Sequence, residues 1–168
     1  MRQRSQWTGS GRAFLNGNPA ARVRIALETT AGQGSSIGHR FEHIRDILNR
    51  IESNERVVVC LDTCHVFAAG YDFRTRKDFE SLKREFDCRI GLDKLAVIHV
   101  NDSKKKLGSR VDRHDHIGRG EIGLEGFRHF LNESLFDRIP KILETPKGDD
   151  LKEDRENLAK LRKLIARE

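Results

Sequence analysis

The chain of 168 residues is 36% hydrophobic and 35% charged, which is typical of one globular domain with a buried core and not of a disordered protein. No apolar stretch is long enough to span a membrane, and the first residues lack the apolar core of a signal peptide, so we expect a cytoplasmic protein without membrane contacts. Residues 1–24 carry five arginines and no acid, whereas the rest carries 27 basic and 26 acidic side chains, so the net charge of +6 is by itself weak support for DNA binding.

The regular elements follow an irregular N-terminal segment. Residues 1–22 show neither helical nor strand periodicity, and we predict a disordered leader there, with one metal-binding domain over residues 23–168. Residues 23–28 alternate as a strand and are followed by the turn-rich residues 29–36. Apolar side chains at helical spacing then predict a helix that packs on a sheet: Phe41, Ile44, Ile47, Leu48 and Ile51.

The second unit begins with a run of β-branched residues. Residues 57–61 are the kind of apolar run that forms a parallel strand buried on both faces, and this run ends abruptly at Asp62 and His65. We predict a loop from there through Gly70 and a helix from about Arg76. A capping box and a terminal glycine delimit that helix: Thr75, Asp78 and Gly91.

Two further units complete the chain. Residues 95–100 predict a strand, and the polar loop 101–122 is too long to be a mere connector before a helix around Phe127. Residues 139–144 predict a fourth strand, with Pro140 near its start. Leucines and an isoleucine mark a terminal helix: Leu158, Leu161, Leu164 and Ile165.

Four consecutive strand–helix units predict a parallel sheet with right-handed crossovers. They equal half of an eight-stranded TIM (β/α)8 barrel. A small open sheet is the other arrangement, but it would leave two unpaired edges and one uncovered face. We therefore expect either a separate N-terminal half or a partner, such as a second copy of the chain.

Each predicted strand ends in a residue type that binds metal ions. Buried acids and imidazoles are avoided unless they are paired or bind metal, so four of them in four strands are an unusual coincidence. Neighbouring parallel strands lie about 5 Å apart, which lets side chains from several strands share one ion or bridge two. The four residues are Glu28, Asp62, His99 and Glu144.

A second set of metal-type residues lies in the loops. His65 follows Asp62 by three positions, and Asp112 and His114 lie two apart, on one side of an extended segment. Two histidines and one carboxylate leave a coordination position open, as in catalytic zinc sites. Asp115 and His116 are alternative ligands.

The long loop also carries basic side chains. A lysine run is usually a solvated face, but here it lies on the loop that brings two metal-type residues to the strand ends, where it could contact a phosphate backbone. The candidates for DNA contacts are Lys104, Arg110, Arg113 and Arg119.

Several long motifs in order resemble endonuclease IV, the family of zinc-dependent apurinic/apyrimidinic endonucleases. The matching segments are residues 27–34 (LETTAGQG), 61–72 (LDTCHVFAAGYD), 99–104 (HVNDSK), 108–114 (GSRVDRH) and 142–146 (ILETP). The resemblance implies a TIM barrel with three zinc ions at one rim. The implied reaction is base excision repair of double-stranded DNA, by hydrolysis of the phosphodiester 5′ to an abasic site and trimming of blocked 3′ ends.

The resemblance also implies roles for individual residues. Glu28 would bridge two ions, and Glu144 would orient the nucleophile. The remaining ligands of one ion would be Asp62, His99 and Glu144, and those of another His65, Asp112 and His114. The chain resembles the second half of the family's barrel, so two zinc sites are recognisably complete.

Two other functions compete with this one. The chain could be a half-barrel that binds metal but does not cleave DNA. It could also be a metal-dependent sugar isomerase of the same barrel class, which the long DNA-repair motifs make the weaker alternative.

Overall fold

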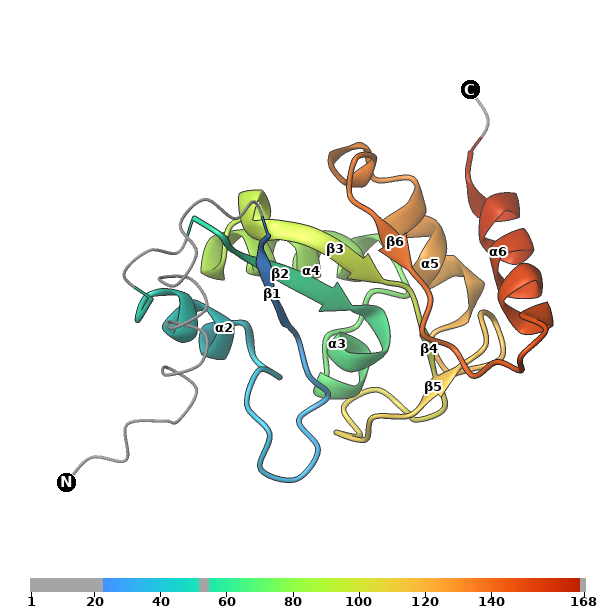
Figure 1. Cartoon of the computed structure of the whole chain (residues 1–168), viewed down its shortest axis with the longest axis horizontal. Helices are drawn as coiled ribbons and strands as arrows, with labels where there is room; N and C mark the ends of the chain where they lie inside the picture. The colour runs from blue at the N-terminus through green and yellow to red at the C-terminus, as the bar shows by residue number, and fades with distance from the viewer. Residues whose placement is uncertain (1–22, 52–54, 167–168) are drawn as a thin grey trace.

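The computed structural model describes residues 23–51 and 55–166; the predicted leader lies outside them. A parallel sheet forms the centre of the molecule (Figure 1), and its strands lie in the order β1-β2-β3-β6. Their bounds are Ile25–Glu28 for β1, Val57–Asp62 for β2, Leu95–His99 for β3 and Lys141–Ile142 for β6. This topology confirms the prediction of consecutive βα units in a partial barrel.

The helices that follow the strands form a continuous outer layer. They are α2 (Phe41–Leu48), α4 (Arg76–Arg89), α5 (Gly123–Leu131) and α6 (Lys152–Leu164), with short 3₁₀ turns at η1 (Leu92–Lys94) and η2 (Ser134–Phe136). Each helix packs against the next: α2 on α4, α4 on α5, and α5 on α6. This is the arrangement expected for an arc of the outer ring of a barrel.

Phenylalanines fill the space between the sheet and the helices. Phe79 of α4 meets Phe130 of α5 edge to face, with 5.0 Å between ring centroids, and Phe41 of α2 meets Phe86 of α4 at 5.3 Å. All four are almost completely buried. Each such ring contributes roughly 1.5–3 kcal/mol through burial, so this layer holds the strands in register.

The predicted signals of α4 are confirmed. The Thr75 hydroxyl accepts a hydrogen bond from the Asp78 N–H at 3.2 Å, and Gly91 takes a positive φ of 98° just after the helix. The cap satisfies one of the free N–H groups of the first turn.

One predicted loop is a helix. Residues 63–69, expected to be irregular up to Gly70, form α3 (Thr63–Ala69). The Asp62 carboxylate caps it by accepting the His65 N–H at 2.8 Å, and Gly70 ends it in the left-handed conformation. The sequence pattern missed the helix because Asp62 both ends a strand and caps the helix that follows at once.

Other boundaries also differ from the prediction. The loop 101–122 contains a short antiparallel pair, β4 (Asp102–Ser103) and β5 (His114–Asp115). β6 is shorter than the predicted 139–144, because Pro140 has no N–H and the Glu144 N–H bonds to a side chain of the loop. In the terminal helix Leu161 and Leu164 are buried, whereas Leu158 and Ile165 are exposed.

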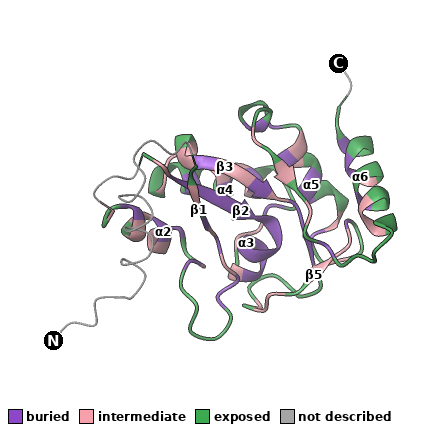
Figure 2. Ribbon diagram, in the orientation of Figure 1, coloured by how far each residue is buried: buried purple, intermediate pink, exposed green. Residues whose placement is uncertain are grey.

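The two faces and edges of the sheet are covered unequally. β2 is buried at all six positions and has the colour of buried residues in Figure 2. Ala26 of β1 and Ile142 of β6, in contrast, are exposed. Among the described strands, β1 and β6 each pair on one side only. No helix in the described part of the chain is long and apolar enough to cross a bilayer.

Candidate metal centre

The four strand-end residues converge on one rim of the sheet. Each of Glu28, Asp62, His99 and Glu144 offers a ligand atom, and these atoms all lie within 4.8 Å of one another. His99 Nδ1 is the central atom: it lies 3.1 Å from Glu28 Oε1, 3.0 Å from Glu144 Oε2 and 3.8 Å from Asp62 Oδ2. Register explains the convergence, because Asp62 pairs with His99 across β2 and β3, and parallel strands end at the same edge.

The loop residues form a second group beside the first. His65 comes from α3, His114 from β5 and Asp112 from the loop before it, and their ligand atoms also lie within 4.8 Å. His65 Nε2 lies 3.1 Å from Asp112 Oδ2, and His114 Nε2 lies 3.6 Å from Asp112 Oδ1. The rival residues Asp115 and His116 belong to no group of three or more metal-type side chains in residues 23–51 and 55–166.

Glu28 and Asp62 join the two groups. Glu28 Oε1 lies 3.4 Å from His65 Nδ1 and 3.1 Å from His99 Nδ1, so one carboxylate faces both groups. Asp62 Oδ2 lies 3.6 Å from His114 Nε2 and 3.8 Å from His99 Nδ1. The centre is therefore continuous, with a fully buried carboxylate at the junction.

The histidines of the loop group are oriented as metal ligands are. His65 Nδ1 lies 2.8 Å from the Thr29 carbonyl oxygen, and His114 Nδ1 lies 3.2 Å from the Glu144 carbonyl oxygen. A bond from Nδ1–H to a carbonyl leaves Nε2 with a free lone pair. In both residues Nε2 is buried and makes no hydrogen bond. Two such nitrogens facing carboxylates fit a divalent ion bound by nitrogen and oxygen, and zinc accepts this donor set.

The charges of the centre depend on one another in the metal-free state. Burial would raise the pKa of Glu28, but hydrogen bonds from His65 and His99 outweigh it and lower the pKa to about 2. Burial would lower the pKa of His65, yet Glu28, Asp62 and Asp112 raise it to about 9. Contacts with Cys60 and Glu28 raise the pKa of His99 to about 11. Both imidazoles must therefore lose a proton before they can bind a metal.

Comparison with known proteins gives the family. Residues 18–164 match the family model described as xylose isomerase-like TIM barrel. The chain belongs to this family. Within it, the chain is 56% identical over 143 residues to a probable endonuclease 4 of Geobacter sulfurreducens, covering 85% of this chain and 48% of that protein. A probable endonuclease 4 of Chloroflexus aurantiacus is 52% identical over 141 residues, covering 84% and 50%.

A solved structure agrees with the sequence relatives. The crystal structure of endonuclease IV from Thermus thermophilus matches with a TM-score of 0.74 and 38% identity, over 91% of this chain and 55% of that one. The resemblance to endonuclease IV inferred from the motifs is confirmed. The chain spans about half the length of the curated relatives that it matches.

Two residues beside the metal centre, Asn101 and Asp102, stabilise this rim of the sheet, although no role was predicted for them from the sequence. Asn101 is fully buried and bonds to Asp62 and to the Glu144 N–H, and Asp102 accepts backbone N–H groups from across the loop. Both residues closely follow His99, the last residue of β3. A pair of polar residues just beyond a strand end is the sequence pattern that could have predicted their role.

Cysteines also lie beside the centre. Cys60 is close to Glu28 and His99, and Cys64 is close to Asp62 and His114. Burial raises the pKa of the Cys60 thiol, and it raises the pKa of Cys64 to about 12. The Cys64 thiol therefore remains protonated in the metal-free protein, whereas Cys60 also contacts the His99 imidazole and raises its pKa.

The four basic candidates for DNA contacts all lie exposed on the loop 101–122. Arg113 also donates a hydrogen bond to the Asp112 carbonyl at 2.6 Å, and Arg110 takes a left-handed φ of 54°. The Arg110 N–H bonds to the Ala68 carbonyl of α3 at 2.9 Å, so this part of the loop is held against α3. The basic side chains thus stand on the same loop as two residues of the centre.

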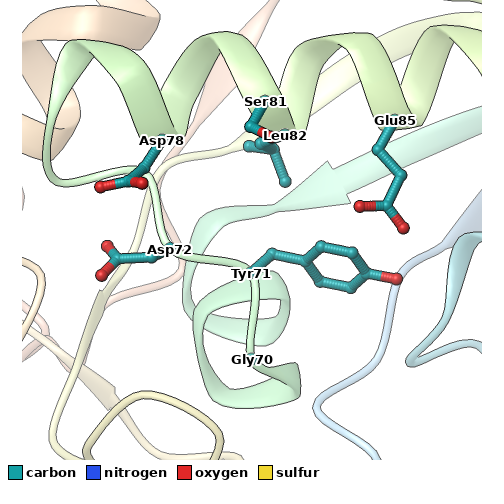
Figure 3. Close-up of a pocket in the computed structure, with 7 residues that line it drawn as sticks. All are labelled: Gly70, Tyr71, Asp72, Asp78, Ser81, Leu82 and Glu85. Carbon is teal, nitrogen blue, oxygen red and sulfur yellow. The ribbon is translucent and has the colours of Figure 1, made fainter.

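A surface pocket lies elsewhere, between α4 and the segment after α3 (Figure 3). Tyr71 forms part of its wall, and its hydroxyl accepts the Phe41 N–H at 3.3 Å. Two of the three acids that line it are partnered: Asp72 pairs with Arg74, and Asp78 bonds to Thr75. None of the lining residues belongs to the metal centre.

Proposed function

We propose that the chain carries the metal-binding part of an apurinic/apyrimidinic endonuclease that acts in the cytoplasm. Its substrate would be double-stranded DNA with abasic sites, cleaved 5′ to the lesion, and DNA with blocked 3′ ends. The observation that carries this proposal is the convergence of four metal-type side chains at four adjacent strand ends with three more from α3, β5 and the loop before β5. The names of the relatives support it.

The proposed ligands form two complete zinc sites. We assign Glu28, Asp62, His99 and Glu144 to one zinc ion, with Glu28 also facing a further ion, and His65, Asp112 and His114 to another. Zinc ions, when bound, would stabilise the charge of the phosphate and lower the pKa of a water molecule. Both contributions suit hydrolysis of a phosphodiester.

Glu144 is the proposed catalytic carboxylate. Its side chain is 45% exposed, whereas Asp62 is fully buried, so Glu144 can reach a water at the surface of the centre. It would orient that water and take its proton at the carboxylate as the water oxygen bonds to phosphorus. The bond from phosphorus to the 3′ oxygen breaks as the water oxygen bonds. The 3′ oxygen then takes a proton from solvent, which gives a 3′-hydroxyl. His99 Nδ1 lies 3.0 Å from this carboxylate, so both side chains can reach the same ion.

The exposed cations of the loop would contact the DNA backbone. Lys104, Arg110, Arg113 and Arg119 offer positive charge beside a centre rich in carboxylates. Such contacts place a duplex without reading its sequence.

The test of this function is a nicking assay. The full chain, loaded with zinc, is incubated with a duplex that holds one abasic site. We expect a single nick 5′ to the lesion that is lost with a chelator and restored by zinc. Glu144→Gln should lower the rate by about 10²–10⁴-fold. Glu125→Gln, an exposed glutamate of α5, is the matched control. Equal nicking by the wild type and Glu144→Gln would reject the assignment.

A second candidate is a half-barrel that binds metal but needs another polypeptide to cleave DNA. Two observations favour it: the chain spans about half of its relatives, and β1 and β6 each lack a second neighbour among the described strands. Zinc bound at two equivalents with no nicking would support it. Size-exclusion mass would show whether two copies associate.

The family description also leaves a sugar isomerase as an alternative. Metal-dependent turnover of an aldose without nicking would favour that function over the nuclease.

A further inference from the structure

Asn101 lies at a point where three strands meet. It follows β3, whereas Asp62 ends β2 and Glu144 follows β6. Its Nδ2 donates to Asp62 Oδ2 at 2.7 Å, and its Oδ1 accepts the Glu144 N–H at 2.8 Å. The side chain therefore touches two of the proposed ligands at once, one through its carboxylate and one through its backbone.

The chemistry of the partners fixes the orientation of this amide. An ionised carboxylate can only accept a hydrogen bond and a backbone N–H can only donate one, so Nδ2 must face Asp62 and Oδ1 must face Glu144. Asn101 is also anchored through its own backbone. The Thr63 hydroxyl donates to the Asn101 carbonyl at 2.7 Å and accepts from its N–H at 2.8 Å.

Burial makes these bonds strong constraints. Asn101, Asp62 and Thr63 are all completely buried. A buried polar group without its partner is costly, so neither the amide nor the carboxylate can turn away freely. Asp62 is held from both sides, because its other oxygen, Oδ1, accepts the His65 N–H at 2.8 Å.

We infer that Asn101 is a positioning residue for the metal centre. It sets the distance between Asp62 on β2 and Glu144 beyond β6, and so shapes the strand-end site most directly. The loop site is affected less directly, because Asp62 Oδ2 and the Glu144 carbonyl oxygen also face His114. This inference rests on the proposed metal sites. Outer partners of metal ligands typically contribute about 10–100-fold to metal affinity.

Zinc titration against a competing chelator tests it in the full chain. For Asn101→Ala we expect the strand-end ion to lose about 10–100-fold in affinity and the loop-site ion to lose less. Asn157→Ala is the matched control. Asn157 is also buried, and it bonds to Thr145 at 2.9 Å and to the Ile117 N–H at 3.1 Å without touching a proposed ligand. It should leave both ions unchanged.

The outcomes are distinct. A wild-type chain that binds no zinc would reject the proposed function and not this inference alone. Wild-type affinity for both ions in Asn101→Ala would overturn the inference. If Asn101→Ala loses its circular dichroism signal, Asn101→Leu fills a similar volume and takes its place. Should both variants unfold while Asn157→Ala folds, Asn101 belongs to the core, and the positioning role is rejected.

Discussion

The two groups of the centre are held in different ways. The strand-end group stands on a parallel sheet in which β2, one of the two inner strands, is buried at every position. The loop group depends partly on residues 101–122, which have only a two-residue strand pair of their own. Asp102 compensates by accepting N–H groups from Ser103, Gly118, Gly120 and Ile122 at 2.8–3.1 Å. A site on sheet scaffolding thus adjoins one whose loop is held by scattered hydrogen bonds, among which Asp102 makes the most.

The largest effect is expected where the two groups share a residue. Asp62→Asn keeps an oxygen to cap α3 but removes the charge that faces both groups, so the affinity for both ions should fall by more than about 100-fold. Asp62→Ala should also destabilise the fold by about 1 kcal/mol or more through loss of the cap. Zinc titration and thermal unfolding measure the two effects.

Thr75→Ala is the control for that cap. It removes the hydroxyl that caps α4, as the Asp62 carboxylate caps α3, and it lies outside the metal centre. The substitution should lower the free energy of unfolding by about 1 kcal/mol without changing the zinc affinity. Unchanged zinc binding in Asp62→Asn would show that Asp62 caps the helix and does nothing more.

The next largest effect is expected from Asp102, whose substitution should weaken the loop group and leave the strand-end group nearly unchanged. Asp102→Asn replaces one acceptor oxygen with a donor that faces N–H groups, which should destabilise the fold by roughly 3 kcal/mol and release the loop. We expect the ion of His65, Asp112 and His114 to weaken by about 10–100-fold and the strand-end ion to change little. Zinc titration and urea unfolding report the two changes.

Gly120→Ala tests the same loop without altering a charge, because an added methyl would collide with the Ser103 carbonyl and the Asp102 carboxylate. It should weaken the same ion. Loss of the strand-end ion instead, in either variant, would contradict the comparison of the two groups.

Removing the metal should expose a dependence on pH. Glu28 has a lowered pKa of about 2, so its contribution to stability is full above about pH 4.5 and is lost as the pH falls. His65 and His99 have raised pKa values of about 9 and about 11. Their contribution to stability is therefore full below about pH 6.5 and is lost as the pH rises. The chelated protein should be most stable near pH 4.5–6.5, as read from urea midpoints.

His99→Gln should flatten the alkaline side of that profile. His129→Gln, whose ring lies beside Phe79 and outside the metal centre, should keep it. A chelated protein that gains stability from pH 6.5 to 9 would contradict these pKa directions.

The smallest effect concerns the exposed cations. Arg113→Ala should weaken binding to any duplex about equally and reduce the salt dependence by about one released ion. Arg84→Ala, on the exposed side of α4, is the control. A fluorescence anisotropy titration at several salt concentrations measures both, and identical salt slopes would remove Arg113 from the DNA surface.

The framework was well predicted because buried strands and capped helices leave local patterns in a sequence. Residues 57–61 were recognisable from β-branching, and α4 from its capping box. The helix α3 was missed because its first turn consists of ligand-type residues, Asp62 and His65, that also end a strand. β6 was overestimated because Glu144 bonds to Asn101 instead of extending a ladder.

The sequence by itself determined which residue types stand at the strand ends, and so named Glu28, Asp62, His99 and Glu144 before any contact was known. Only the tertiary structure decided that Asp62 joins two groups, that Asp112 and His114 lie beside His65 while Asp115 and His116 do not, and that Asn101 ties two strands together. The physical reason is the separation along the chain over which each kind of interaction acts. Periodicity and caps act over a few residues, whereas these contacts join positions roughly 30 to 50 apart in the chain, and only sheet register and loop closure bring them together.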